Sequence, residues 1–104
     1  HIELSKLLDD PDFNNKYVLI DVRTPVEYRM GTIPSSINIP HYDILRDVSL
    51  LDAYKDKEMI LYCHSGVRAG KVTRLLTTLE YTNLSHLEGD ISGWKHQDKP
   101  LVKP

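Results

Sequence analysis

The strongest constraint on the fold comes from two short segments that lack the alternation of polar and apolar residues. They are residues 17–22 (YVLIDV) and 59–62 (MILY). Such uninterrupted runs are typical of strands buried on both faces of a parallel sheet, because both sides of the strand pack against helices. The two runs therefore predict an α/β fold with a mainly parallel central sheet and helices on both of its faces.

Further helices are predicted where apolar residues recur at helical spacing or where a capping motif occurs. The predicted helical segments are residues 4 to about 10, a short helix capped by residues 24–27 and ended by Gly31, residues 42–54 with a break near Ser49, about 67–79, and one turn around Trp94. A short edge strand is predicted within residues 33–40 and another strand at 84–87. The tail, residues 99–104, contains two prolines and is predicted to form neither helix nor strand.

Length and charge limit the classes of protein that the chain can belong to. A chain of 104 residues, 40% hydrophobic and 27% charged, predicts one globular domain over residues 1–104. A formal charge of -2 gives no global field that would collect nucleic acid or anionic membrane. No apolar run approaches the roughly 20 residues needed to span a bilayer. We therefore expect no nucleic-acid partner and no membrane span.

The beginning of the chain bears on location. It starts at His1 and shows no basic stretch followed by an apolar one, so a signal peptide is either absent or already removed. We expect a soluble protein in the cytoplasm, or in the periplasm if a signal peptide was removed.

The chain contains a single cysteine, Cys63. This count excludes an internal disulfide, a Cys-x-x-Cys redox pair and a multi-thiolate zinc site. Apart from His64, which follows the cysteine, the histidines lie singly, without the paired spacing of metal ligands, at His1, His41, His86 and His96. We therefore predict no metal site and no cofactor.

Cys63 directly follows the second buried run and precedes a predicted helix. In open α/β sheets, ligands bind beyond the carboxyl ends of the strands, where loops lead into helix N-termini. Backbone amides at such a helix start favour negative charge on a thiolate or on a sulfur attached to it. Gly66 permits the tight turn and Arg68 adds a cation. Cys63 is therefore either a packed small hydrophobe or a nucleophile, and the Cys-x-x-Gly-x-Arg spacing favours the nucleophile.

Three motifs around this loop occur in order along most of the chain. The first comprises DVR at residues 21–23, EY at 27–28 and GTIPSSINIP at 31–40. The second is YCHSGVR at residues 62–68, and the third is LEGDISGW at 87–94. Together they resemble the motifs of the rhodanese-like sulfurtransferases in their single-domain form. The sequence departs from the family pattern at Thr32 for His, Ser35-Ser36 for Gly-Ala, Ala69-Gly70 where Ser is common, and Asp90 for the second Gly of the closing motif.

The resemblance implies a rhodanese-like fold and a sulfurtransferase mechanism of the thiosulfate sulfurtransferase type. The Cys63 thiolate would take a sulfane sulfur from a donor such as thiosulfate, and the persulfide would pass it to cyanide or a thiol. A protein acceptor is an additional expectation. Because the chain has no second cysteine, the acceptor must be external. The residues implied in binding the outer sulfur or the donor are His64, Ser65, Gly66, Val67, Arg68 and Ala69.

Two other functions stay open at this stage. One is a sulfur-relay or protein-interaction module whose physiological acceptor is a protein. The other is a cysteine-dependent phosphatase, which the loop length disfavours. Phosphatases of the related fold place five residues between cysteine and arginine, whereas here there are four, and this smaller ring suits one sulfur atom.

Charged residues near the loop have more ordinary roles in this interpretation. Arg23 is expected to pair with Asp21 or Glu27 and to fix the end of the first strand. His64 is expected to line the entrance, and Lys71 to lie on a solvated basic stripe from which it could assist anion capture or docking.

Overall fold

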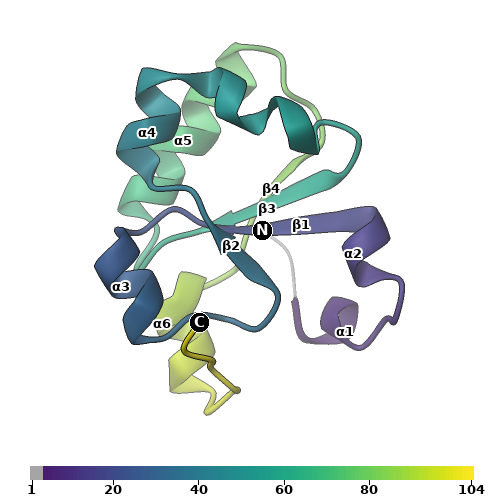
Figure 1. Ribbon diagram of the computed structural model, residues 1–104, viewed down its shortest axis with the longest axis vertical. Coiled ribbons are helices and arrows are strands. Elements are labelled where there is room, and N and C mark those ends of the chain that lie inside the picture. The colour runs from purple at the N-terminus through teal and green to yellow at the C-terminus, as the bar shows by residue number, and fades with distance from the viewer. Residues whose placement is uncertain (1–3) are drawn as a thin grey trace.

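The computed structural model describes residues 4–104 and contains a four-stranded sheet whose strands are all parallel (Figure 1). The strand order is β2-β1-β3-β4. The strands are β1 (Tyr17–Asp21), β2 (Ser36–Asn38), β3 (Glu58–Tyr62) and β4 (Leu84–His86). The two apolar runs thus form the two central strands, and the short segment bounded by prolines forms an edge strand, as predicted.

Helices cover both faces of this sheet (Figure 1). Beside the strands, the chain forms α1 (Leu4–Leu8), α2 (Phe13–Lys16), α3 (Pro25–Met30), α4 (His41–Arg46), the 3-10 helix η1 (Val48–Tyr54), α5 (Val67–Thr78) and α6 (Asp90–His96). The predicted α/β fold is confirmed. No helix within residues 4–104 is both long and apolar enough to cross a bilayer.

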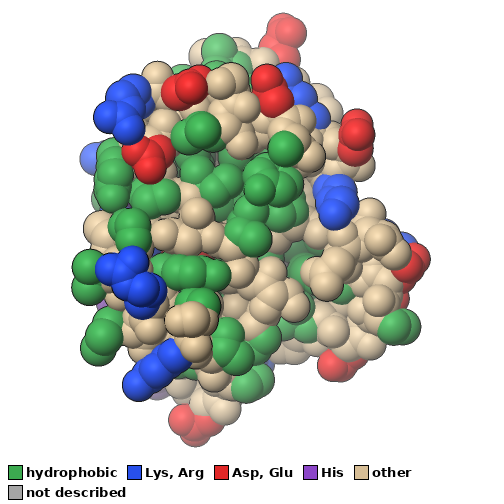
Figure 2. Space-filling view, in the orientation of Figure 1, with side chains coloured by type: hydrophobic (Ala, Val, Ile, Leu, Met, Phe, Trp, Pro, Cys, Tyr) green, Lys and Arg blue, Asp and Glu red, His purple; other side chains and the backbone are tan. Residues whose placement is uncertain are grey.

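Alternate residues of the central strands supply two separate cores. Val18, Ile20 and Leu61 pack with α4, η1 and α5 on one face. Leu19 and Ile60 pack with α1, α2 and α6 on the other. Because both sets are almost fully buried, neither strand alternates between apolar and polar residues. Over α4 and η1, hydrophobic side chains also reach the surface (Figure 2), among them Tyr42, Leu45 and Leu50.

The capping box predicted at the start of α3 is present. The Glu27 amide donates to the Thr24 hydroxyl, at 3.3 Å, and the Thr24 amide donates to the Glu27 carboxylate, at 3.2 Å. Pro25 occupies the first turn, where no intrahelical donor is needed. The helix ends at Met30 and Gly31 follows as its C-cap, as predicted.

Three local features differ from the predictions. The predicted break near Ser49 is present at Asp47, but the second helix is a 3-10 helix, at whose start the Asp47 carboxylate accepts the Ser49 amide. The short helix α2 was not predicted, since four residues carry too little periodicity. The C-terminal tail is not fully irregular: Thr32 and Val102 exchange two main-chain hydrogen bonds of 2.8 Å in an antiparallel bridge.

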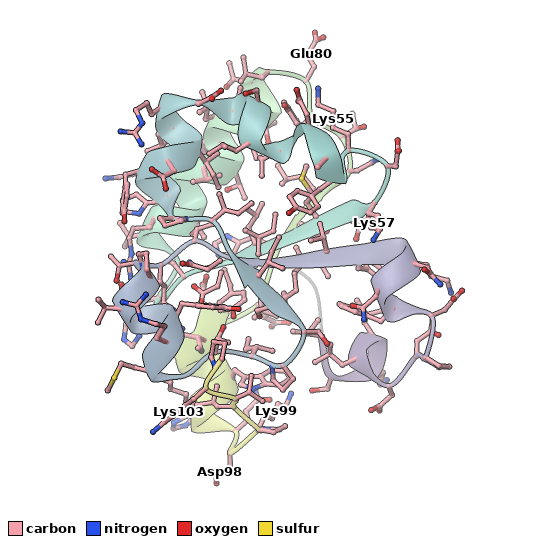
Figure 3. All side chains as sticks on the ribbon, viewed as in Figure 1. Lys55, Lys57, Glu80, Asp98, Lys99 and Lys103 are labelled. Carbon is pink, nitrogen blue, oxygen red and sulfur yellow. The ribbon has the colours of Figure 1, made fainter. Side chains whose placement is uncertain are left out.

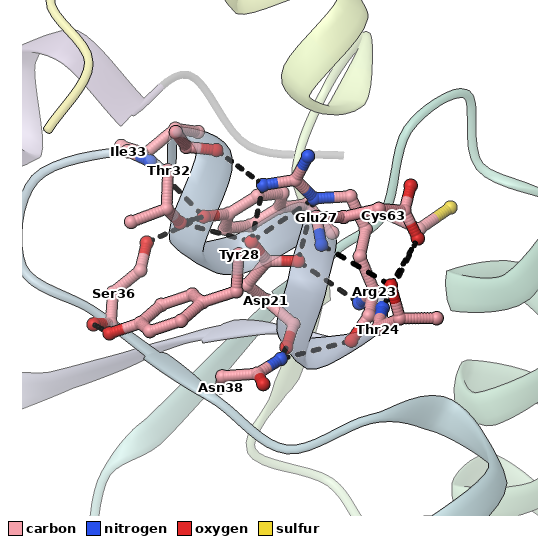
Figure 4. A network of polar contacts seen from close by, with 12 residues as sticks. Asp21, Arg23, Thr24, Glu27, Tyr28, Thr32, Ile33, Ser36, Asn38 and Cys63 are labelled. Atoms are coloured by element: carbon pink, nitrogen blue, oxygen red, sulfur yellow. Dashed lines mark hydrogen bonds and ion pairs between the residues drawn. The ribbon is translucent and has the colours of Figure 1, made fainter. Parts of the chain in front are cut away.

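A buried polar network ties the end of β1 to the chain that follows α3 (Figure 4). Arg23 donates to both carboxylate oxygens of Asp21, the shortest contact being 2.7 Å, and to the Gly31 carbonyl at 2.7 Å. Thr32 donates to Asp21 at 3.0 Å and also contacts the Tyr62 hydroxyl at 2.6 Å. The predicted structural role of Arg23 is confirmed, with Asp21 as its partner. Every charge in this network is compensated, as a buried site requires.

Tyr62 is the hub of that network on β3. Its ring is fully buried, and its hydroxyl also contacts the Ser36 hydroxyl at 2.7 Å and accepts the Ile33 amide at 3.3 Å. Burial, and then the charge of Asp21, raise the pKa of Tyr62, so the phenol stays protonated.

The first prediction concerns this hydroxyl. Tyr62→Phe should lower the free energy of unfolding by about 1–3 kcal/mol, because it leaves buried hydroxyl and amide groups without a partner. Tyr28→Phe is the matched control, since it removes a single hydrogen bond from a half-buried hydroxyl to the Ser36 carbonyl. Urea unfolding of both variants measures the difference. Equal stability of the two variants would contradict the assigned role of the network.

Candidate active site

Cys63 lies immediately beyond the carboxyl end of β3, the position that the sequence predicted. Its side chain belongs to the core on the α4 and α5 side of the sheet and is 1% exposed. The amide of Gly66 donates to the Cys63 sulfur at 3.0 Å. The chain therefore folds back over its own cysteine and directs a backbone donor at the sulfur, an arrangement that favours negative charge there.

We call residues 63–68 the Cys63 loop. Gly66 is the N-cap of α5 and has a φ of 104°, in the left-handed region that favours glycine. The amides that follow Gly66 open α5, where the first four N–H groups of a helix have no intrahelical acceptor. Ala69 is buried, whereas His64, Ser65 and Val67 are exposed. The structure thus places the cysteine, the turn and the helix start together, with His64 at the surface as expected.

Arg68 pairs with a carboxylate that the sequence analysis had not assigned to it. Its two terminal nitrogens donate to the two oxygens of Glu27 at 2.6 and 3.1 Å. The hydrogen bond from Arg68 is the main reason that the pKa of Glu27 falls from 4.5 to about 2, and the Thr24 amide lowers it further. The same hydrogen bond raises the pKa of Arg68, to which Cys63 contributes less. Arg68 is therefore a fixed cation beside the sulfur, already neutralised in part.

Two residues at the rear of the Cys63 loop were missed from the sequence. Asp90 is 4% exposed, and its carboxylate accepts the Cys63 amide at 3.0 Å. The same oxygen lies 2.8 Å from His86 Nε2. The only sequence signal was the departure of Asp90 from the glycine of the resembled motif. His86 carried no signal, because its contact is made across a turn between a strand and a helix.

Other candidate residues lie outside the immediate site. Lys71 and Arg74 are exposed on α5, in agreement with a solvated basic stripe. Within the described part of the chain, no group of three His, Cys, Asp or Glu side chains could hold a metal ion. His1 lies outside the described residues.

Two surface cavities, of about 250 and 240 Å³, lie away from Cys63. The first is lined by residues that precede β3 and β4, among them Lys55 and Glu80, and so opens at the opposite edge of the sheet (Figure 3). The second lies between Leu4 and Trp94. Chemistry argues against both as the reaction site, because neither is lined by a cysteine, and the raised pKa of Lys55 in the first cavity comes from its exposed ion pair with Asp52.

The fold and the site together define an α/β protein with a cysteine held at a strand end, under the amides of a helix start. The sequence pattern of the rhodanese-like domain family matches residues 2–97. The chain therefore belongs to the rhodanese-like domain family, as its motifs predicted.

Two similar proteins match most of this chain, but the matched part is a different share of each relative's own length. A sulfurtransferase from Allochromatium vinosum is 31% identical over 87 residues, which is 84% of this chain and 79% of the relative. A tRNA uridine(34) hydroxylase from Erwinia tasmaniensis is 34% identical over 94 residues, covering 86% of this chain. The chain spans only 25% of the length of that hydroxylase.

Solved structures agree with the fold. A rhodanese-related protein from Thermoplasma volcanium superposes with a TM-score of 0.76 at 30% identity, covering 94% of this chain and 95% of the other. A thiosulfate sulfurtransferase from Pseudomonas aeruginosa gives a TM-score of 0.79 at 24% identity, covering 96% of this chain and 19% of the other. At that identity the second comparison supports the fold alone.

The second prediction tests the turn at Gly66. A Cβ placed there would lie 2.9 Å from an Asp90 carboxylate oxygen, and the left-handed φ adds about 1–2 kcal/mol for a residue other than glycine. Gly66→Ala should therefore destabilise the protein and change the rate at which iodoacetamide alkylates Cys63. Gly70→Ala is the control, because its Cβ would make an ordinary contact of 3.6 Å with Arg74 inside α5. If both variants behave like the parent, the turn is not constrained as described.

The third prediction concerns the ion pair of Glu27 and Arg68. A carboxyl group whose pKa is depressed by folding stabilises the folded state above its unfolded pKa, near 4.5, and this contribution disappears as pH falls toward about 2. Glu27→Gln keeps the capping amide contact but loses the charge. It should cost about 1 kcal/mol or less near neutral pH, since the pair is partly exposed and screened.

Urea unfolding at several pH values measures this cost, which should shrink between pH 4.5 and about 2. A constant difference between parent and variant over that range would contradict the assignment.

Proposed function

We propose that this protein is a sulfurtransferase that carries sulfane sulfur as a persulfide on Cys63. The observation that carries the proposal is the hydrogen bond of 3.0 Å from the Gly66 amide to the Cys63 sulfur, at the start of α5. A persulfide adds one sulfur atom bearing negative charge, and the amides at the start of α5 are suited to that charge. The sulfurtransferase from Allochromatium vinosum lends further support.

We write the proposed reaction with thiosulfate as the sulfur donor, because its terminal sulfur is small enough to approach a thiolate that lies below the surface. The Cys63 thiolate attacks the outer sulfur, a new S–S bond forms, and the bond between the two sulfurs of thiosulfate breaks. Sulfite leaves with the electron pair, and Cys63 holds the persulfide. Cyanide or a thiolate then attacks the outer sulfur, which regenerates the Cys63 thiolate and releases thiocyanate or a persulfide. The cycle needs no other oxidant or reductant.

The surroundings of Cys63 support this assignment over a phosphatase and over a module that only binds other proteins. Four residues separate Cys63 from Arg68, and Cys63 is 1% exposed, so the loop has little room for a tetrahedral phosphate. An intact nucleophile beside Arg68 is not expected in a module that only binds other proteins. The proposal includes an external acceptor, either a small thiol, cyanide or a protein thiol, because Cys63 is the only cysteine of the chain.

The fourth prediction tests the persulfide directly. Incubation with thiosulfate should raise the intact mass by about 32 Da, the mass of one sulfur atom, and cyanide should remove the addition. Cys63→Ser is the matched control and should gain no mass, because serine cannot form the persulfide. No adduct with thiosulfate, with an organic persulfide or with a thiosulfonate would overturn the proposed function.

A further inference from the structure

Asp90 stands out among the residues around Cys63, because its charge is buried and its backbone conformation is unusual. It begins α6, is 4% exposed and has a φ of 54°. This left-handed conformation costs most residues about 1 kcal/mol, although aspartate tolerates it better than others. The family pattern that the sequence resembles has glycine here, which adopts this conformation freely. The side chain of Asp90 therefore occupies a position that the backbone alone would assign to glycine.

The contacts of this carboxylate are with the Cys63 loop and with β4. Oxygen Oδ1 accepts the Cys63 amide at 3.0 Å and lies 2.8 Å from His86 Nε2. A carboxylate is a stronger acceptor for such groups than a neutral oxygen. Because the Cys63 amide donates to Asp90, it is unavailable to the sulfur, which accepts the Gly66 amide later in the loop.

The first turn of α6 holds the same segment by its main chain. The Ile91 amide donates to the Cys63 carbonyl at 3.1 Å, and the Ser92 amide donates to the His64 carbonyl at 3.0 Å. Any residue at these two positions other than proline would supply those bonds. Of these three hydrogen bonds at the start of the loop, only the one that Asp90 accepts depends on the identity of a side chain.

Asp90 and His86 also lie behind the turn at Gly66. A Cβ added to Gly66 would meet Asp90 Oδ2 at 2.9 Å and His86 Cε1 at 3.5 Å. The carboxylate therefore lies beside two points of the Cys63 loop, its first residue and the turn at Gly66. These two residues carry the two atoms of the contact described above, the Cys63 sulfur and the Gly66 amide.

We infer that Asp90, supported by His86, is a positioning residue for sulfur transfer: it fixes the Cys63 backbone so that the loop amides are aimed at the sulfur. The inference rests on the proposed function of Cys63. Asp90 does not touch the reacting sulfur in this role. It acts through the loop, so its removal should slow the formation of the persulfide more than it weakens binding of the donor.

The fifth prediction compares the parent with Asp90→Gly, Asp90→Asn and Asp98→Gly. Asp90→Gly removes the acceptor of the buried Cys63 amide and relieves the backbone, and because these two effects oppose each other its free energy of unfolding should stay within about 2 kcal/mol of the parent. Asp90→Asn keeps an oxygen acceptor for the Cys63 amide. Asp98→Gly is the matched control: Asp98 has a φ of 55°, is exposed and follows α6 (Figure 3). It relieves the same kind of backbone strain away from Cys63.

Persulfide formation from thiosulfate is followed by intact mass over time, at several donor concentrations. Asp90→Gly should lower the maximal rate about tenfold or more, with less than about a twofold change in the donor concentration at half-maximal rate. Asp90→Asn should stay within about threefold of the parent, because the hydrogen bond is retained. Asp98→Gly should react at the parental rate. Urea unfolding of each variant shows that stability does not explain the difference.

A parental rate in Asp90→Gly would overturn the inference and leave the proposed function intact. A stable Asp90→Asn that is as slow as Asp90→Gly would also overturn it, since the acceptor would then not be the feature that matters. If the parent forms no persulfide, the proposed function fails, and alkylation of Cys63 by iodoacetamide tests the positioning of the loop alone. In that alkylation experiment, a change of about threefold in the alkylation rate of Asp90→Gly that is absent in Asp98→Gly supports positioning. Equal alkylation rates in the two variants overturn it.

Discussion

The pairing of β1 with β3 is the constraint on which the rest of the structure depends. The two strands run parallel with Asp21 opposite Tyr62, and the Val22 amide donates to the Tyr62 carbonyl at 2.9 Å. Parallel strands deliver their carboxyl ends to one edge of a sheet, so the segment after β1 and the Cys63 loop emerge side by side. A slip by one residue would exchange the two faces of β3 and move Cys63 out of its core. The register thus fixes the site as well as the core.

Two ion pairs lie at this edge of the sheet and differ in their exposure to solvent. The pair of Arg23 and Asp21 is fully enclosed and has further hydrogen-bond partners, which is the condition under which a buried ion pair is tolerated. The pair of Arg68 and Glu27 keeps about a quarter of the arginine side chain and a third of the glutamate side chain exposed. The first pair is part of the scaffold, whereas the second is open to solvent. The sequence predicted a structural ion pair for Arg23 and a place beside Cys63 for Arg68, but not the partner of Arg68.

Local patterns in the sequence predicted most of the elements, and contacts across the chain account for what they missed. The capping box at Thr24 and the buried run of β1 are readable because all their determinants lie within a few residues. The bridge that holds Val102 was not readable, because the proline-containing tail is ordered by a distant partner. The same holds for the pairing of Arg68 with Glu27, 41 residues apart. Cys63 was found because strand, loop and helix follow one another directly.

The pairing of Arg68 with Glu27 bears on how an anionic donor would be handled under the proposed function. With a pKa of about 2, Glu27 is ionised near neutral pH, so Arg68 does not offer a full unpaired charge. A fully free arginine would bind thiosulfate and departing sulfite alike, and such uniform binding does not accelerate the chemical step. The loop amides act at the sulfur itself, where charge appears as the persulfide forms. Selective stabilisation of the persulfide is therefore expected to come from the backbone of the Cys63 loop, with Arg68 contributing a weaker attraction.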